Sequence, residues 1–211
     1  MRDYPAWHSQ YDDPTSSLAQ RLAIVQRRLR QLLAEAPSGP VRVISMCAGQ
    51  GRDVIGVLSN HPRRADVRAL LVEVDPGIVE FARASAARAG LSQIDIVEGD
   101  AASSDIYMRS IPADIVLACG VLGNVSDAEV ANTVRNLSML CRPGAAVIWT
   151  RHRLEPDLTP KIRQWFVESG FEELSFDAPD NPGRSGIGTA RLVAAPVPFQ
   201  PAFRFFSTFT R

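Results

Sequence analysis

The sequence lacks several features that would place the protein in large functional classes. Of its 211 residues only three are cysteines, Cys47, Cys119 and Cys141, and their spacing fits neither a disulfide framework nor a metal site. Its 23 basic and 23 acidic residues give no net charge, which argues against a nucleic-acid-binding surface. No apolar run approaches the roughly 18 residues of a membrane span, and the N-terminus lacks the apolar core of a signal peptide. We therefore expect a reduced cytoplasmic protein without metal, nucleic acid or membrane partners.

Length and composition indicate one compact domain. A chain of 211 residues lies at the upper end of the usual range for a single domain, and 45% hydrophobic content is sufficient for a core. No internal repeat, low-complexity tract or second domain is visible. We divide the chain into an N-terminal lid and helix, residues 1–36, and an α/β domain, residues 37–211.

The segment Val41–Asp53 predicts the opening unit of a nucleotide-binding sheet. A run of β-branched and apolar residues leads into a turn with Gly49 and Gly51, and a helical pattern begins at Val54. Glycine permits the positive φ angles of such turns and leaves room for a ligand beside the backbone. The unpaired N–H groups at the start of the helix favour an anionic group at the same place.

The spacing around this turn distinguishes between kinds of nucleotide. The dinucleotide pattern G-x-G-x-x-G fails at Val54, where its third glycine belongs, and no Gly-Lys-Ser/Thr follows for a P-loop. Glu73 ends the next apolar run, 73 − 51 = 22 residues after Gly51, and a carboxylate there suits a ribose diol. The expected ligand is therefore a nucleoside with a small anionic tail.

These residues resemble the first motif of class I S-adenosylmethionine-dependent methyltransferases, which often reads Asp-x-Gly-x-Gly-x-Gly. Ser45, Cys47, Gly49 and Gly51 occupy its four fixed positions, so the aspartate and the first glycine are replaced. The resemblance covers roughly residues 41–150. Later segments resemble further motifs of the family: Glu73 before Pro76, Ile96–Ala101, Ala113–Gly120 and Leu140–Ala145.

Alternating strand and helix patterns predict an α/β fold with a parallel, doubly wound sheet. The resemblance implies a Rossmann-like sheet of seven strands, mostly parallel with one antiparallel strand, in the order 3-2-1-4-5-7-6. For the last strand we expect Phe203–Phe209, with Thr189–Ala195 as the competing candidate and Ala178–Gly188 as a loop. The other expected strands are Val67–Asp75, Asp95–Glu98, Asp114–Ala118, Ala146–Thr150 and Phe171–Phe176. The expected helices run from a cap at Thr15, Ser16 or Ser17 to about Glu35, over Pro76–Gly90, from a cap at Asp127 to about Cys141, and over Thr159–Ser169.

The resemblance implies S-adenosylmethionine as cofactor and S-adenosylhomocysteine as product. Glu73 would bond the ribose hydroxyls and Asp100 would face the adenine amino group. Arg52 either reaches the methionine carboxylate or lies on the surface. The predicted cofactor-binding residues belong to the carboxyl ends of the strands and the turns after them: Cys47, Ala48, Gly49, Gln50, Gly51, Glu73, Val74, Gly99, Asp100, Ala101, Cys119 and Gly120.

The implied reaction is an in-line methyl transfer, for which alignment of the acceptor matters most. The candidates for proton transfer are His152, His8 and Tyr11, although a lone histidine is more often structural. The expected acceptor is a small molecule, contacted by Asn124, Arg151 and Arg153. Alternatively, Asn124 caps a turn, and Arg151 and Arg153 are solvated surface residues.

Two N-terminal segments have alternative interpretations. Residues 4–14 combine aromatic and polar side chains, among them Trp7 and Tyr11, and form either a lid over the site or a packed tail. The helix that follows carries arginines on its polar face. We interpret this face as solvated, and the alternative is a site for an anion or a partner. These arginines are Arg21, Arg27, Arg28 and Arg30.

Two other functions compete with methyl transfer. The replaced motif positions Ser45 and Cys47 are compatible with a non-catalytic protein that binds an adenosyl ligand as a regulator or accessory subunit. An NAD(P)-dependent oxidoreductase is disfavoured by Val54. The sequence leaves open the methyl acceptor, whether oxygen, nitrogen or carbon is methylated, and the oligomeric state.

Overall fold

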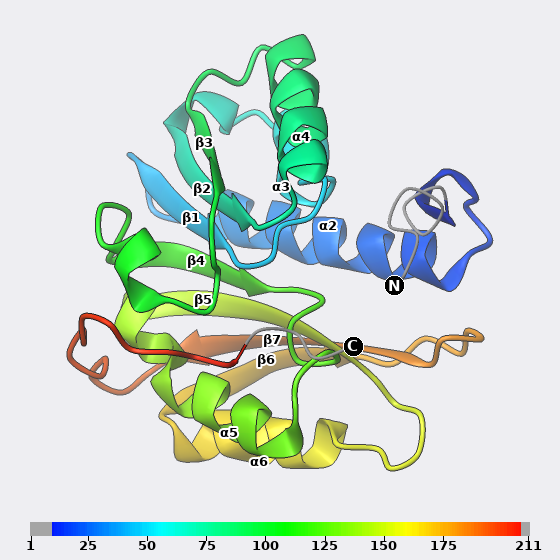
Figure 1. The fold of residues 1–211 in the computed structure, drawn as a ribbon, viewed down its shortest axis with the longest axis vertical. Coiled ribbons are helices and arrows are strands. Elements are labelled where there is room, and N and C mark those ends of the chain that lie inside the picture. Colours follow the sequence, from blue (N-terminus) through cyan, green and yellow to red (C-terminus); the bar gives the residue numbers. More distant parts are fainter. Residues whose placement is uncertain (1–9, 208–211) are drawn as a thin grey trace.

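A central β-sheet with helices on both faces forms the protein (Figure 1). The computed structural model describes residues 10–207. Seven strands form the sheet in the order β3-β2-β1-β4-β5-β7-β6, which confirms the expected topology. All neighbouring strands are parallel except that β7 runs antiparallel to both β5 and β6. The strands are β1 (Val41–Ser45), β2 (Val67–Glu73), β3 (Ile94–Glu98), β4 (Ala113–Ala118), β5 (Cys141–His152), β6 (Phe171–Asp177) and β7 (Ser185–Leu192).

The helices begin at polar caps that the sequence supplies. Ser16 accepts a hydrogen bond from the Ala19 N–H at the start of α2. The expected cap Asp127 of α5 is wrong, because Ser126 and Glu129 form a reciprocal capping box one residue earlier. No helix within residues 10–207 is both long and apolar enough to cross a bilayer. The α-helices are α2 (Ser17–Glu35), α3 (Val54–Leu58), α4 (Pro76–Arg88), α5 (Asp127–Asn136) and α6 (Thr159–Glu168), and the 3-10 turns are η1 (Gln10–Asp12), η2 (Arg64–Asp66), η3 (Ser104–Tyr107) and η4 (Leu137–Leu140).

Each face of the sheet has its own hydrophobic core. Val41 and Val43 of β1 pack with α2, α3 and α4, whereas Ile44 lies in the core with α5 and α6. This alternation follows from the period of two along a strand, which sends neighbouring side chains to opposite faces. Both faces are covered, so the central strands are apolar throughout and their carboxyl ends meet at one edge.

The final strand differs from our first expectation. The last strand is Ser185–Leu192, which overlaps the competing candidate Thr189–Ala195 and includes part of the expected loop. The Phe203–Phe209 strand is wrong over its described part, because residues 203–207 form no named strand. β7 contains glycines because aromatic rings fill the space beside it. A Cβ at Gly188 would lie 2.1 Å from Trp149 Cε2.

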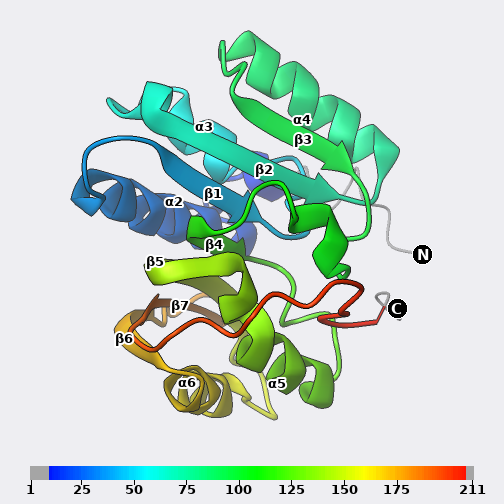
Figure 2. The same ribbon diagram turned by 90° about the vertical axis from the view of Figure 1, so that its left-hand side faces the viewer.

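Residues 197–207, here called the C-terminal strap, pass over α5 toward η3 (Figure 2). Phe205 and Phe206 are buried within it, and the Phe205 carbonyl accepts a hydrogen bond from Thr133 Oγ1 at 2.9 Å. Arg204 forms an isolated bridge with Ser103 in the chain after β3. Buried aromatic side chains therefore anchor an irregular segment where a strand was expected.

Candidate functional site

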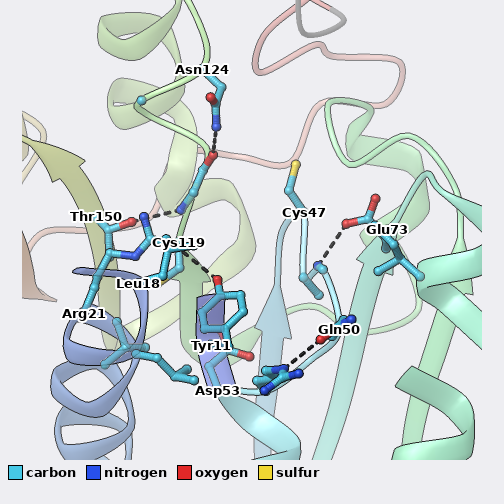
Figure 3. A pocket seen from close by; sticks show the side chains of 18 of the residues that line it. Tyr11, Leu18, Arg21, Cys47, Gln50, Asp53, Glu73, Cys119, Asn124 and Thr150 are labelled. Atoms are coloured by element: carbon cyan, nitrogen blue, oxygen red, sulfur yellow. Dashed lines mark hydrogen bonds between the residues drawn. The ribbon is translucent and has the colours of Figure 1, made fainter. Parts of the chain in front are cut away.

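A cavity of about 600 Å³ opens at the carboxyl ends of β1, β2, β4 and β5. The strand ends form one side, and α2 with η1 closes another (Figure 3). Such a position, where the strand order reverses, is the usual ligand site of an open parallel sheet. The lining residues are Tyr11, Leu18, Arg21, Leu22, Val25, Cys47, Ala48, Gly49, Gln50, Arg52, Asp53, Glu73, Val74, Asp75, Pro76, Ile78, Cys119, Gly120, Gly123, Asn124, Thr150, Arg151 and His152.

The turn after β1 depends on left-handed backbone conformations. Gly49 has a φ of 56° and Gly51 a φ of 66°, values that glycine adopts without strain. A Cβ at Gly51 would lie 2.7 Å from Leu71 Cδ2 and 2.8 Å from Ile55 Cδ1. Gly51 is therefore required by the packing under the turn, whereas Gly49 lies on the cavity wall.

Glu73 connects the turn to the end of β2. Its carboxylate accepts hydrogen bonds from the N–H groups of Gly49 at 2.9 Å, Val74 at 2.8 Å and Asp75 at 3.1 Å. Because an ionised carboxylate has about four acceptor positions, the Glu73 oxygens retain capacity for a ligand. Figure 3 shows this carboxylate beside the β1 turn, on the side of the cavity away from Thr150.

Asp53 is the buried acid of the cavity. Its side chain accepts a hydrogen bond from the Val54 N–H at 2.7 Å, and the residue is 8% exposed. Burial raises the pKa of Asp53 to about 6, an effect that the Val54 hydrogen bond and the charge of Arg21 oppose. Burial also raises the pKa of both Cys47 and Cys119, so these residues remain neutral thiols at pH 7.

The opposite part of the cavity presents Asn124, Arg151 and His152 at the ends of β4 and β5. Asn124 Nδ2 donates a short hydrogen bond to the Gly120 carbonyl, and the Gly120 N–H donates to Thr150 Oγ1 at 2.9 Å. Burial, together with the nearby charge of Arg151, lowers the pKa of His152, so its imidazole is neutral at pH 7. A neutral imidazole is able to accept a proton.

The structure brings together most of the residues that the sequence predicted for the site. Twelve of them line the cavity: Tyr11, Cys47, Ala48, Gly49, Gln50, Glu73, Val74, Cys119, Gly120, Asn124, Arg151 and His152. Gly51, Gly99, Asp100, Ala101 and Arg153 are not among the lining residues. His8 lies outside the described residues.

Two charged residues outside the cavity wall have other partners. Asp100 forms an ion pair with Arg204 of the C-terminal strap at 2.9 Å. Arg153 donates to the carbonyls of Pro179 at 2.9 Å and Ser185 at 3.3 Å. Arg153 therefore stabilises the segment that leads into β7. This geometry does not support its predicted contact with the methyl acceptor.

Sequence reasoning missed the contribution of α2. Leu18, Leu22 and Val25 of α2 line the cavity together with Arg21. The spacing shows that positions 18, 21, 22 and 25 share one face of a helix, but it does not show that this face borders a cavity. Arg52, in contrast, bonds Gln50 Oε1 at 2.7 Å and Asp12 Oδ1 at 2.8 Å.

Residues 43–144 match the family model described as a methyltransferase domain. The fold is similar to that of magnesium protoporphyrin IX methyltransferase from Synechocystis PCC 6803, solved with bound S-adenosylmethionine, at a TM-score of 0.68 and 16% identity. That match covers 89% of this chain and 90% of the other. The domain match and the shared fold together support a class I S-adenosylmethionine-dependent methyltransferase family.

Other methyltransferase structures share the fold. An O-methyltransferase family protein from Burkholderia thailandensis matches at a TM-score of 0.68 and 17% identity, over 90% of this chain and 60% of that chain. The CurJ carbon methyltransferase matches at 0.70 and 15%, over 91% of this chain and 59% of that one. The chain thus spans about three-fifths of these two proteins. A comparison with curated protein sequences gave no match.

Proposed function

We propose that the protein transfers a methyl group from S-adenosylmethionine to a small-molecule acceptor in the cytoplasm. The observation that carries this proposal is the layout of the cavity, which has Glu73 and the glycine turn on one side and Asn124, Arg151 and His152 on another. Its volume of about 600 Å³ lies within the range of about 300–1,000 Å³ for small-ligand sites. The three free cysteines fit a reducing compartment.

The residues beside Glu73 fit the adenosyl part of the cofactor. Glu73 offers carboxylate oxygens to vicinal hydroxyls, and Val74 and Ile78 supply apolar surface next to it. Val74 is 63% exposed, so a flat base packing there would remove apolar area from water. The adenine contact of Asp100 stays a prediction, since its carboxylate is engaged with Arg204.

The remaining polar residues are placed to align an acceptor. Bound S-adenosylmethionine supplies a methyl group on a positively charged sulfur, which is already activated toward attack. Asn124 is held by the Gly120 carbonyl and faces the cavity from the loop after β4. His152, neutral at pH 7, would take the proton of an acceptor hydroxyl or amine as the new bond forms. Alignment of the acceptor is the larger contribution to the rate.

The N-terminal turn is suited to serve as the lid. Tyr11 of η1 lines the cavity, and the Arg52 guanidinium lies 5.2 Å from the centre of its ring. Asp12 forms an exposed ion pair with Arg52 at 2.8 Å. Exposed pairs contribute only about 0–1 kcal/mol, so the Asp12–Arg52 pair would open at low cost when an acceptor enters.

The replaced motif positions favour one alternative, a non-catalytic adenosyl-binding protein. Ser45 and Cys47 stand where the family often has Asp and Gly, and the Ser45 hydroxyl is buried without a hydrogen-bond partner within the described chain. Cys47 adopts a φ of 48°, a conformation that favours glycine.

Binding and transfer assays together separate the candidates. The protein would be titrated with S-adenosylhomocysteine and with NAD by calorimetry, then incubated with S-adenosylmethionine and a panel of small metabolites for mass spectrometry. We expect S-adenosylhomocysteine binding, no NAD binding and at least one methylated product. Binding without any methyl transfer would favour the non-catalytic alternative, and failure to bind S-adenosylhomocysteine contradicts both.

A further inference from the structure

Arg21 differs from the other cations of the cavity in its partners. Three arginines line the cavity: Arg21, Arg52 and Arg151. Arg52 pairs with Asp12 at 2.8 Å, and Arg151 lies 3.9 Å from Asp127 while also donating to the Leu122 carbonyl. Within residues 10–207 no carboxylate lies within salt-bridge distance of Arg21.

The surroundings of Arg21 are mostly apolar. It projects from α2 among Leu18, Leu22 and Val25, which line the same wall, and it is half-buried. Its guanidinium donates a long hydrogen bond, 3.4 Å from Nη2 to the Tyr11 hydroxyl (Figure 3). Burial raises the pKa of Tyr11, so at pH 7 this partner is a neutral phenol rather than an anion.

Two other arginines of α2 have a carboxylate partner, unlike Arg21. Arg27 and Arg28 both pair with Asp177 of β6, at 2.8 and 2.7 Å, and neither lines the cavity. Asp53 interacts electrostatically with Arg21 but lies beyond salt-bridge distance of it. The half-buried guanidinium therefore loses hydration without gaining a directly paired opposite charge. The planar fork of arginine matches a carboxylate, which would supply that charge through charge-assisted hydrogen bonds.

We propose that Arg21 binds the carboxylate of a ligand in this cavity, in the role that the sequence suggested for Arg52. This inference rests on the proposed function, and the carboxylate has two possible sources. One is the amino-acid tail of the methyl donor, and the other is an acidic acceptor. Tyr11 positions the guanidinium by accepting its hydrogen bond.

The test compares ligands that differ only in the amino-acid tail. Calorimetry would measure S-adenosylhomocysteine and 5′-methylthioadenosine, which lacks the tail carboxylate, with the wild-type protein and Arg21→Met. If Arg21 holds the tail, the variant loses about 10- to 100-fold in affinity for S-adenosylhomocysteine and keeps its affinity for 5′-methylthioadenosine. Arg27→Met, on the same helix but paired with Asp177, is the matched control and should leave both affinities unchanged.

A second arm examines the acceptor as the source. Benzoate and benzamide would be titrated into the protein saturated with S-adenosylhomocysteine. Benzoate binding that is present in the wild type, absent for benzamide and lost in Arg21→Met supports an acidic acceptor. Arg21→Lys, which keeps the charge without the planar fork, should give intermediate losses and serves as the second variant if Arg21→Met does not fold.

Defined results would overturn the inference. Equal losses for the two nucleosides would show general damage to the site, and unchanged S-adenosylhomocysteine and benzoate binding in both Arg21 variants would show that Arg21 meets no carboxylate. These outcomes leave the proposed function intact, because the wild-type protein still binds the nucleosides. Failure of the wild-type protein to bind either nucleoside overturns both proposals.

Discussion

Asp53 and Glu73 are both carboxylates of the cavity wall, but their environments differ. Glu73 accepts three backbone N–H bonds at the ends of two strands. Asp53 accepts the Val54 N–H and is nearly enclosed, so its ionised form is poorly solvated. The first arrangement is suited to holding a ligand, whereas the second makes stability depend on pH.

Replacing Asp53 by asparagine should stabilise the protein at high pH. Burial raises the pKa of Asp53 from 3.8 to about 6, which corresponds to about 3 kcal/mol. Because the folded pKa lies above the unfolded value, the stability from protonated Asp53 is complete below about pH 4 and lost as the pH rises through about 6.

Thermal unfolding between about pH 4 and pH 8 measures this effect. Asp53→Asn should melt several degrees above the wild type at pH 8, and the two curves should converge toward pH 4. Asp12→Asn removes an exposed acid near the same cavity and should shift the melting temperature little at any pH. An Asp53→Asn protein that melts below the wild type at pH 8 would contradict the assignment.

His152 should titrate below its ordinary pKa of 6.5. Burial disfavours the imidazolium ion, and the charge of Arg151 adds to that effect. An NMR pH titration would show it, with the signal assigned by its loss in His152→Gln, since the chain has three histidines. In Arg151→Met the His152 midpoint should move upward. A wild-type midpoint at or above 6.5 would rule out a neutral imidazole base of this kind.

At the scale of elements, the β1–α3 turn is fixed by what lies under it. Gly51→Ala should destabilise the fold by about 2–4 kcal/mol, because it combines positive-φ strain with overpacking against Leu71 and Ile55. Gly144→Ala is the control: its φ is 79°, but nothing lies within 4 Å of the added Cβ. Urea unfolding should show the larger loss at Gly51, and equal losses would mean that packing under the turn is unimportant.

The last strand shows where element prediction from sequence ends. Gly186 and Gly188 made residues 185–188 of β7 look like part of a loop, because glycine is depleted in strands. They are needed there because the rings of Phe176 and Trp149 lie where their Cβ atoms would be. In the C-terminal strap the error is the reverse, because a strand was expected where there is none. Phe205 and Phe206 are buried by side-chain packing, without the backbone pairing of a strand. Both errors come from tertiary contacts that a local pattern does not contain.

At the scale of the whole molecule, the sheet order and the position of the site were predictable. The family resemblance implied the sheet order, which the structure confirms. The cavity lies where Gly49, Glu73 and Gly120 were expected at strand ends. The wall made by α2 was not predictable, because an amphipathic helix does not reveal where its neighbours leave a space. Arg21 was expected to be solvated, but the position of α2 brings it into the cavity wall beside the strand ends.

The central claim is that Glu73 and the glycine turn form an adenosyl-binding site, and a calorimetric titration with S-adenosylhomocysteine tests it most directly. The wild-type protein should bind one equivalent. Glu73→Ala should bind at least about tenfold more weakly, because it removes charge-assisted hydrogen bonds to the ribose. Equal affinities for the two proteins, or no binding to the wild type, would contradict the account.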